Sequence, residues 1–192
     1  MKSSDRLLVV AAHADDEIIG CGGLLAIHEG PIHIIYCTEP GGVRGTGEKL
    51  LTTVEKVSES LNCSYSILPF EDQRLDTVNQ IECNRYVEAI INEFKPDIVI
   101  THSIHDNNTY HQFVHRSVNV AAREIKNLLY FRIPSLGEFP GFDGRISYAI
   151  LWNLKKNLLR LYDDEMRPYP HPRSYEALKS DYEYYEVGRL QL

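Results

Sequence analysis

The stretch "LLVVAAHADDEIIGCGG", residues 7–23, places an apolar run directly against a histidine and three consecutive carboxylates. A continuous apolar, β-branched run is typical of a strand that is covered on both faces. Moving an ionised carboxylate out of water costs on the order of several kcal/mol unless a cation meets it. Either a helix N-terminus or a metal ion therefore has to supply the partner where this strand ends.

The alternation of strand-like and helix-like segments continues to residue 133. Short apolar runs at 6–12, 32–38, 64–70, 97–103 and 127–133 are separated by segments of helical period at 21–30, 49–62, 81–94 and 111–125. This order predicts βαβ units, and hence an α/β fold with a mostly parallel sheet flanked by helices.

Beyond residue 133 the alternation weakens, and we interpret 134–192 as a C-terminal extension over the active-site edge of a sheet core that spans 1–133. A single domain, 1–192, suits this length. We expect a long amphipathic helix over 146–162 and a tyrosine-rich final helix over 175–188. The apolar stripe of the first of these helices is interpreted as core packing and comprises Ile146, Ile150, Leu151, Leu154, Leu158 and Leu161.

The bulk composition excludes several classes of protein. Apolar residues make up 43% and the formal charge is −7, so general binding to nucleic acid or to an anionic membrane is not expected. No apolar stretch approaches the roughly 18 to 20 residues that span a bilayer, so we expect no membrane insertion. The four cysteines form no CxxC pair and are interpreted as reduced thiols, which predicts a cytoplasmic protein.

Chemically active side chains follow four of the predicted strands. "HADDE" follows the first, "GGVRGTG" the second, "EDQRLD" the third and "THSIHDNNTYH" the fourth. Open parallel sheets bind ligands outside the carboxyl ends of their strands. We therefore expect all four segments to meet at one edge of the sheet.

His13, Asp16 and His111 are the candidate metal ligands at this edge. Two imidazoles and one carboxylate leave a fourth position open on a tetrahedral zinc ion, as in catalytic sites, where zinc lowers the pKa of bound water to about 7. Asp15 is the candidate base that takes the proton from this water. The alternatives are that Asp15 or Asp16 caps the next helix and that His111 is a structural or solvated histidine.

Four motifs, in this order along the chain, resemble those of the PIG-L/LmbE-like zinc-dependent N-deacetylases, which remove acetyl from N-acetylglucosaminyl groups. "AAHADDEIIGCGG" resembles their first signature, "AHPDDE…GcGG". "LPFEDQRLDT" is similar to their substrate-loop pattern, and "THSIHDNNTYHQFVHR" to their second motif. "YDDEMRPYPHPRS" is similar to a segment of the bacterial subgroup that acts on carbohydrate precursors, so the resemblance runs from about residue 6 to 178.

The resemblance implies a Rossmann-like sheet and assigns the same three ligands and the same base. Zinc (Zn²⁺) is the implied cofactor, and histidine and carboxylate ligands also suit Fe²⁺, Mn²⁺ and Co²⁺. Many family members carry His where this chain has Asn108 and Asp where it has Tyr110, so an amide is the implied donor to the oxyanion. His102 and His105 are candidates for orienting the ligands rather than binding the metal.

Further polar residues are candidates for substrate binding. Asp72 and Arg74 follow the third predicted strand and are expected to contact sugar hydroxyls or a phosphate; the alternative is a solvated turn with a local ion pair. Arg44 lies in a glycine-rich segment whose backbone amides are able to approach an anion. His171 and Arg173 are flanked by prolines and are expected to reach over the pocket, or else to form a surface turn.

These patterns predict a metal-dependent amide hydrolase that deacetylates an N-acetylhexosamine derivative, a small-molecule sugar. The alternative is a non-catalytic metal-, sugar- or nucleotide-binding module with the same fold. Asp15 favours the enzyme, because a pure binder needs no free carboxylate beside the open metal position. A dinucleotide fingerprint at "GCGG" fails because its third glycine would fall at Leu25. The number of subunits stays open, with a homo-oligomer as one option.

Overall fold

A computed structural model describes residues 2–41, 47–134 and 145–191 as one α/β unit built on a single sheet. The elements in chain order are β1 (Leu7–Ala11), α1 (Asp16–Ile27), β2 (Ile32–Tyr36), α2 (Gly47–Leu61), β3 (Ser64–Ile67), η1 (Leu75–Thr77), α3 (Gln80–Phe94), β4 (Ile98–His102), α4 (Thr109–Ala121), β5 (Asn127–Phe131), β6 (Arg145–Ala149), α5 (Trp152–Leu159), η2 (Arg160–Glu165), α6 (Tyr175–Leu178) and β7 (Tyr182–Arg189). The single-domain interpretation stays a prediction.

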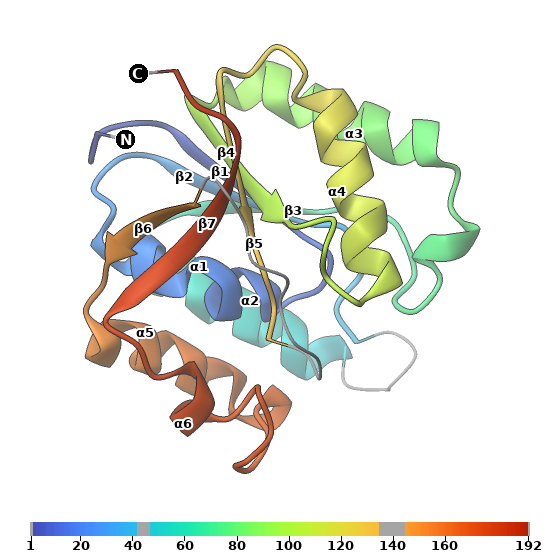
Figure 1. Cartoon of the computed structure of the whole chain (residues 1–192). Coiled ribbons are helices and arrows are strands. Elements are labelled where there is room, and N and C mark those ends of the chain that lie inside the picture. The colour runs from blue at the N-terminus through green and yellow to red at the C-terminus, as the bar shows by residue number, and fades with distance from the viewer. Residues whose placement is uncertain (1, 42–46, 135–144, 192) are drawn as a thin grey trace.

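The sheet has seven strands in the order β3-β2-β1-β4-β5-β7-β6 (Figure 1). The five strands β1 to β5 pair in parallel, whereas β7 runs antiparallel to β5 and β6 antiparallel to β7. The predicted mostly parallel sheet with flanking helices is therefore confirmed. The chain moves outward from β1 through β2 to β3 and then returns to place β4 on the other side of β1, as in Rossmann-like folds.

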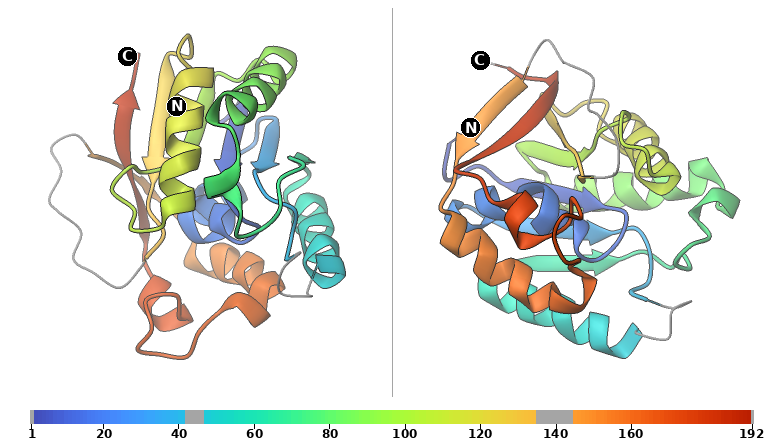
Figure 2. Two further views of the ribbon diagram at one scale, coloured as in Figure 1. Left: turned by 90° about the vertical axis from the view of Figure 1, so that its right-hand side faces the viewer. Right: turned by 60° about the horizontal axis from the view of Figure 1, so that its bottom comes forward.

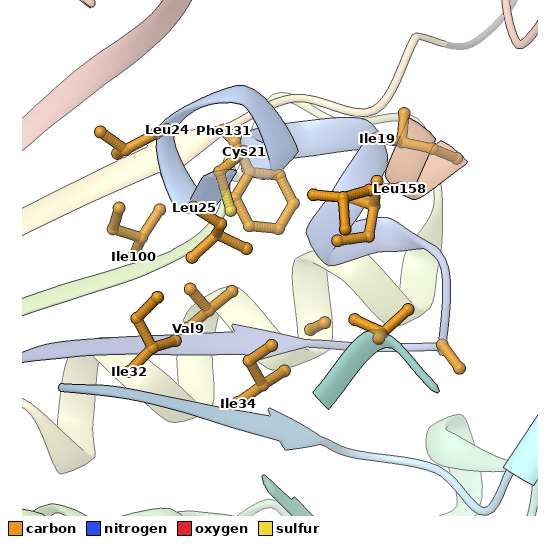
Figure 3. Packing of buried hydrophobic residues seen from close by; sticks show 14 of the residues in the cluster. Val9, Ile19, Cys21, Leu24, Leu25, Ile32, Ile34, Ile100, Phe131 and Leu158 are labelled. Carbon is orange, nitrogen blue, oxygen red and sulfur yellow. The ribbon is translucent and has the colours of Figure 1, made fainter. Parts of the chain in front are cut away.

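Helices cover both faces of the sheet. Figure 2 shows α3 and α4 on one face and α1, α2 and α5 on the other. Each face has its own cluster of buried apolar side chains. Figure 3 shows Leu25 of α1 facing Val9 of β1 in one of these clusters. Burial on both faces explains why β1 and β4 read as continuous apolar runs rather than alternating ones.

The "GCGG" segment of α1 is explained by close packing. A Cβ added at Gly20 would lie 2.3 Å from the ring of Phe131, and one added at Gly23 would lie 2.6 Å from the side chain of Ile150. Atoms cannot approach so closely, so these positions require glycine. They let α1 lie directly against β5 and against Ile150, two residues before α5.

The predicted helix over 146–162 is wrong in its first part. Residues Arg145–Ala149 form β6, and only Trp152–Leu159 form the α-helix α5. Ile150 and Leu158 are buried as expected, but Leu151 is 60% exposed and Leu154 is 38% exposed. The helical spacing was misleading because the segment changes from strand to helix, and a change of period moves residues off the shared face.

The predicted final helix over 175–188 is also wrong. Only α6 is helical there, with Ser174 as its N-cap, and β7 follows it. Tyrosine and valine favour strands, and β5 leaves an edge whose backbone groups need partners. Tyr185 is fully buried, whereas Tyr182 and Tyr184 are exposed.

Among the described residues, no helix combines the length and the apolar character that crossing a membrane requires.

Candidate active site

The candidate site lies at the carboxyl ends of β1 and β4, which are neighbours in the sheet. Successive connections leave in opposite directions at this point, because β1 leads to β2 on one side and β4 leads to β5 on the other. A cavity of about 340 Å³ opens here. The ends of parallel strands at such a switch point are where open α/β sheets place ligands.

The cavity is lined by residues of three of the segments that the sequence predicted to converge; of the fourth, "GGVRGTG", Gly41 lines it and residues 42–46 lie outside the described residues. Its described walls come from the segments that follow β1 to β5, from the first turns of α1, α2 and α4, and from the C-terminal part between the end of η2 and α6. They are formed by His13, Ala14, Asp15, Asp16, Thr38, Pro40, Gly41, Leu50, Asp72, Gln73, Asp106, Asn108, Tyr110, His111, Ile133, Pro134, Glu165, His171 and Arg173.

Asp16 is the centre of the polar network. Its Oδ2 atom lies 3.2 Å from Nδ1 of His13 and 3.3 Å from Nε2 of His111, and it accepts the backbone N–H of His13 at 3.0 Å. The neighbouring imidazoles favour the charged form and hold the pKa of Asp16 well below its usual range, although burial acts in the opposite direction. The carboxylate is therefore ionised at neutral pH and available as a ligand.

The three predicted ligands fit a divalent cation. One donor atom from each of His13, Asp16 and His111 lies within 4.8 Å of the other two. Ligand atoms bound at about 2.0 to 2.1 Å around tetrahedral zinc are about 3.3 Å apart. The distances of 3.2 and 3.3 Å from Asp16 to the two imidazoles match that edge length.

The far side of His111 is held by a second carboxylate. Asp106 places Oδ2 3.0 Å from Nδ1 of His111 and accepts backbone N–H groups from Asn108 and Ile133. A carboxylate on the second ring nitrogen is the usual arrangement behind a metal-bound imidazole, because it fixes the ring and leaves the other nitrogen free to bind. Sequence reasoning missed Asp106, although its place in "HDNNTYH" was a signal.

His102 supports the same ring from behind. It is fully buried, its ring stacks on that of His111 with centroids 4.0 Å apart, and its Nε2 accepts the backbone N–H of Ala12 at 2.9 Å. An imidazole nitrogen that accepts this bond is unprotonated, and burial lowers the pKa of His102 well below its usual range. His102 therefore lies where the sequence placed an orienting residue, whereas His105 is exposed.

Asp15 occupies the N-cap position of α1 but makes no capping hydrogen bond. Its carboxylate instead pairs with the guanidinium of Arg173 and lines the cavity. Burial raises the pKa of Asp15 to about 7, although Arg173 opposes the rise. The capping alternative is therefore not what the structure shows, and a carboxyl with a pKa near neutrality lies beside the three ligands.

Glu17 is the functional-site residue that sequence reasoning left without a role of its own. It is fully buried, its Oε1 accepts the hydroxyls of Tyr36 at 3.1 Å and Tyr162 at 2.8 Å, and its Oε2 accepts the backbone N–H of Asp15 at 3.0 Å. Burial raises the pKa of Glu17 to about 8. The third carboxylate of "DDE" thus faces the protein interior rather than the cavity.

The predicted substrate-binding residues fall into three groups. Asp72, Asn108, His171 and Arg173 line the cavity, and Asp72 also lies 3.7 Å from Nε2 of His13. Arg74 is absent from the described walls and forms an exposed ion pair with Glu71 at 3.2 Å, as in the solvated-turn alternative. Arg44 lies outside the described residues.

Solved structures with the same fold include proteins of different activity. A conserved protein from Thermus thermophilus is 21% identical with a TM-score of 0.79, over 97% of this chain and 95% of that one. The N,N'-diacetylchitobiose deacetylase from Pyrococcus horikoshii is 12% identical with a TM-score of 0.74, over 96% and 84%. A 4-carboxy-2-hydroxymuconate hydratase from Pseudomonas putida is 14% identical with a TM-score of 0.74, over 95% of each chain. At these identities the likeness establishes the fold alone.

Comparison of the sequence with family models gives a match, whereas comparison with curated proteins does not. The family model of PIG-L, described as GlcNAc-PI de-N-acetylase, matches residues 8–124. That range holds the ends of β1 and β4 and all three candidate ligands, and it exceeds half of the chain. The chain therefore belongs to the PIG-L family.

Proposed function

We propose that this protein is a metal-dependent amide hydrolase that removes the acetyl group from an N-acetylhexosamine derivative, releasing acetate and a free amine. The observation that carries the proposal is the joint geometry of two imidazoles and one carboxylate around a single point, with the carboxyl of Asp15 beside them in one cavity. The description of the family as a de-N-acetylase supports the same reaction.

His13, Asp16 and His111 would hold the metal. A divalent cation at this place would polarise the acetamide carbonyl and lower the pKa of water enough for attack at neutral pH. Zinc fits the donor set, and Fe²⁺, Mn²⁺ and Co²⁺ share this preference for imidazole and carboxylate.

Asp15 is the proton carrier in this proposal. A base works best when its pKa is close to the working pH, and the pKa of about 7 meets that condition. Asp15 first accepts a proton from the attacking water and then donates it to the departing amine. The same carboxyl thus serves as base and then as acid.

Asn108 is suited to donate to the developing oxyanion. Its side-chain oxygen accepts the backbone N–H of Tyr110 at 2.8 Å, which directs the oxygen into the start of α4. The amide NH₂ is then the half of the side chain that is left for the cavity. A fixed donor near the carbonyl stabilises charge that appears only in the transition state.

The sugar would be held by Asp72, His171 and Arg173, which line the cavity. A volume of about 340 Å³ is in the range of small-molecule sites and accommodates one hexosamine unit. Carboxylates such as Asp72 accept hydrogen bonds from hydroxyl groups, of which a sugar has several.

The test is acetate release from a panel of N-acetylhexosamines that are free, phosphate-linked or nucleotide-linked, with the metal removed and restored. We expect release that chelation abolishes and Zn²⁺ restores. Asp15→Asn should bind metal normally and lose about 100-fold or more in kcat, whereas His13→Ala should lose the metal. Asp164→Asn, at an exposed carboxylate, is the matched control.

Two outcomes would reject the proposal. Acetate release that persists after verified metal removal would exclude the metal mechanism. The absence of acetate release across the panel, together with water addition to 4-carboxy-2-hydroxymuconate, would indicate the chemistry of the hydratase that shares the fold.

A further inference from the structure

Glu17 is a buried carboxyl for which the proposed reaction has no use. It directly follows the ligand Asp16, yet it does not line the cavity and is fully buried beneath it. A carboxyl is expensive to bury, so its retention requires that all its acceptor sites be satisfied. Three donors meet this requirement, and they come from three different parts of the chain.

The backbone of Asp15 is in an unusual conformation. Its φ angle is 120° and its ψ angle −31°, a left-handed region that residues with a side chain rarely adopt. Such a conformation persists only when surrounding contacts enforce it, and it is found mainly at functional sites. It determines the direction in which the Asp15 side chain leaves the chain, toward Arg173 and the cavity.

The backbone N–H of Asp15 donates to Oε2 of Glu17 at 3.0 Å. This bond fixes the peptide group that precedes the Asp15 Cα atom, which is the group whose rotation defines φ. The ion pair with Arg173 acts at the far end of the side chain and cannot fix that rotation. The Glu17 carboxyl is therefore the contact that holds the unusual angle from the N-terminal side.

The other oxygen of Glu17 is held rigidly. Tyr36, at the end of β2, and Tyr162, in η2, both donate their hydroxyls to Oε1, and both tyrosines are buried. Two donors from different elements fix the position and the plane of the carboxyl. The Glu17 carboxyl therefore links β2 and η2 to the backbone of Asp15 through hydrogen bonds.

We propose that Glu17 is a positioning residue that acts through Asp15: its carboxyl, clamped by Tyr36 and Tyr162, holds the Asp15 peptide in the left-handed conformation that aims the base into the cavity. This inference deepens the proposed function and rests on it. Metal binding is not part of the role, because the ligand atoms of His13, Asp16 and His111 do not contact the Glu17 carboxyl in any described interaction.

The first test compares Glu17→Met, which removes both acceptor oxygens at similar volume, with Tyr162→Phe, which removes one donor and leaves the bond to Asp15. We expect Glu17→Met to lose about 10- to 100-fold in kcat with KM little changed, because the base is misaimed. Tyr162→Phe should change kcat by less than about threefold, because Tyr36 still donates to Oε1 and the bond from Asp15 to Oε2 remains. Glu17→Gln keeps an oxygen that is able to accept the Asp15 N–H, so it should retain most of the wild-type kcat. It also provides a test of the bond to Asp15 if Glu17→Met does not fold.

The affinity for Zn²⁺ distinguishes a role of Glu17 in positioning Asp15 from a general loss of structure at the site. We expect the Zn²⁺ dissociation constant of Glu17→Met to stay close to that of the wild type, unlike the about 10- to 100-fold loss that follows removal of a partner of a metal ligand. A parallel loss of metal and kcat in both Glu17→Met and Glu17→Gln would overturn the proposal, because it would show collapse of the whole segment.

A double-mutant cycle with Asp15→Asn gives the decisive readout. If Glu17 acts through Asp15, Glu17→Gln and Glu17→Met should have no further effect on kcat in the Asp15→Asn background. Additive losses would overturn the proposal.

A wild type that releases no acetate would reject the proposed function rather than the role of Glu17. Crystal structures of the wild type and of Glu17→Met then test that role. A φ angle at Asp15 that stays near 120° in Glu17→Met overturns the inference, and a changed angle supports it.

Discussion

Arg173 and Asp15 form an ion pair across 158 positions of the chain. Sequence reasoning placed both residues near the pocket, Asp15 by its place after a strand and Arg173 by its proline-flanked loop, but nothing in either segment indicated that they touch. The pair joins the proposed base to the C-terminal segment. It also explains why the buried Asp15 carboxyl titrates near neutrality rather than far above it, since the guanidinium opposes the effect of burial.

We predict that Arg173→Met raises the pKa of Asp15, because it removes the positive charge that lowers this pKa. The base form then requires a higher pH, so the acidic limb of the kcat/KM profile should move to higher pH. At pH 7 the activity should fall by about tenfold or more.

The measurement is a pH profile of kcat/KM for Arg173→Met beside that of Arg167→Met. Arg167 is an exposed neighbour whose backbone N–H donates to the carbonyl of Arg173 at 3.2 Å, a bond that Arg167→Met keeps, so its profile should match the wild type. An unshifted profile in Arg173→Met would show that the ion pair does not tune the base.

At the scale of elements, α1 is kinked at Cys21, and side chains of α5 and β7 form hydrogen bonds with the backbone groups that the kink leaves without helical partners. Cys21 has non-helical angles, φ −143° and ψ 17°, so backbone groups on both sides of it lack helical partners. Lys155 of α5 donates to the carbonyl of Ile19 at 2.8 Å, and Glu183 of β7 accepts the N–H groups of Gly23 and Leu24, each at 2.8 Å. The two charged side chains also pair with each other at 2.6 Å.

We predict that Glu183→Ala lowers the free energy of unfolding by about 3 to 5 kcal/mol, because it leaves a buried ammonium group and two backbone N–H groups without their partner. Both side chains of the pair are only 5% exposed. Urea denaturation measures the change.

The matched control is Glu71→Ala. It removes the ion pair with Arg74, whose two side chains are 61% and 65% exposed, and should cost less than about 1 kcal/mol. Equal losses at the two sites would show that the buried pair does not stabilise the break in α1.

At the scale of the whole molecule, the C-terminal extension is part of the fold rather than an addition to it. Leu159, Tyr162 and Tyr185 belong to the same buried cluster as β1 and α1. β7 provides hydrogen-bond partners for the edge of β5. The extension also supplies Tyr162 to Glu17 and Arg173 to Asp15.

A chain truncated after Ile133 is therefore expected not to fold, although it retains the range that matches the family model and all three candidate ligands. It would expose the edge of β5 and one side of the apolar cluster. Near-ultraviolet circular dichroism and binding of a hydrophobic dye report the loss. A chain truncated after Arg189 keeps β7 and should fold; a cooperative unfolding transition in the shorter chain would contradict the prediction.

The sequence by itself determined the parallel core and the position of the site. β1 and β4 are buried on both faces, so their apolar runs were unambiguous, and residues placed just after such strands have to meet at one edge. His13, Asp16 and His111 could be proposed as candidate ligands for that reason, and because ligand chemistry restricts which residue types are able to bind a metal. These features depend on local pattern and on general rules of topology.

Only the tertiary structure decided what depends on a distant partner. Residues 145–149 and 182–189 are strands because they pair with each other and with β5, and no local period records such a pairing. Glu17 looked like a third acidic residue of a motif, and its inward direction follows from Tyr36 and Tyr162, which are far from it in sequence. Local sequence sets preferences of modest size, whereas burial and pairing across the fold contribute more free energy and therefore determine the outcome.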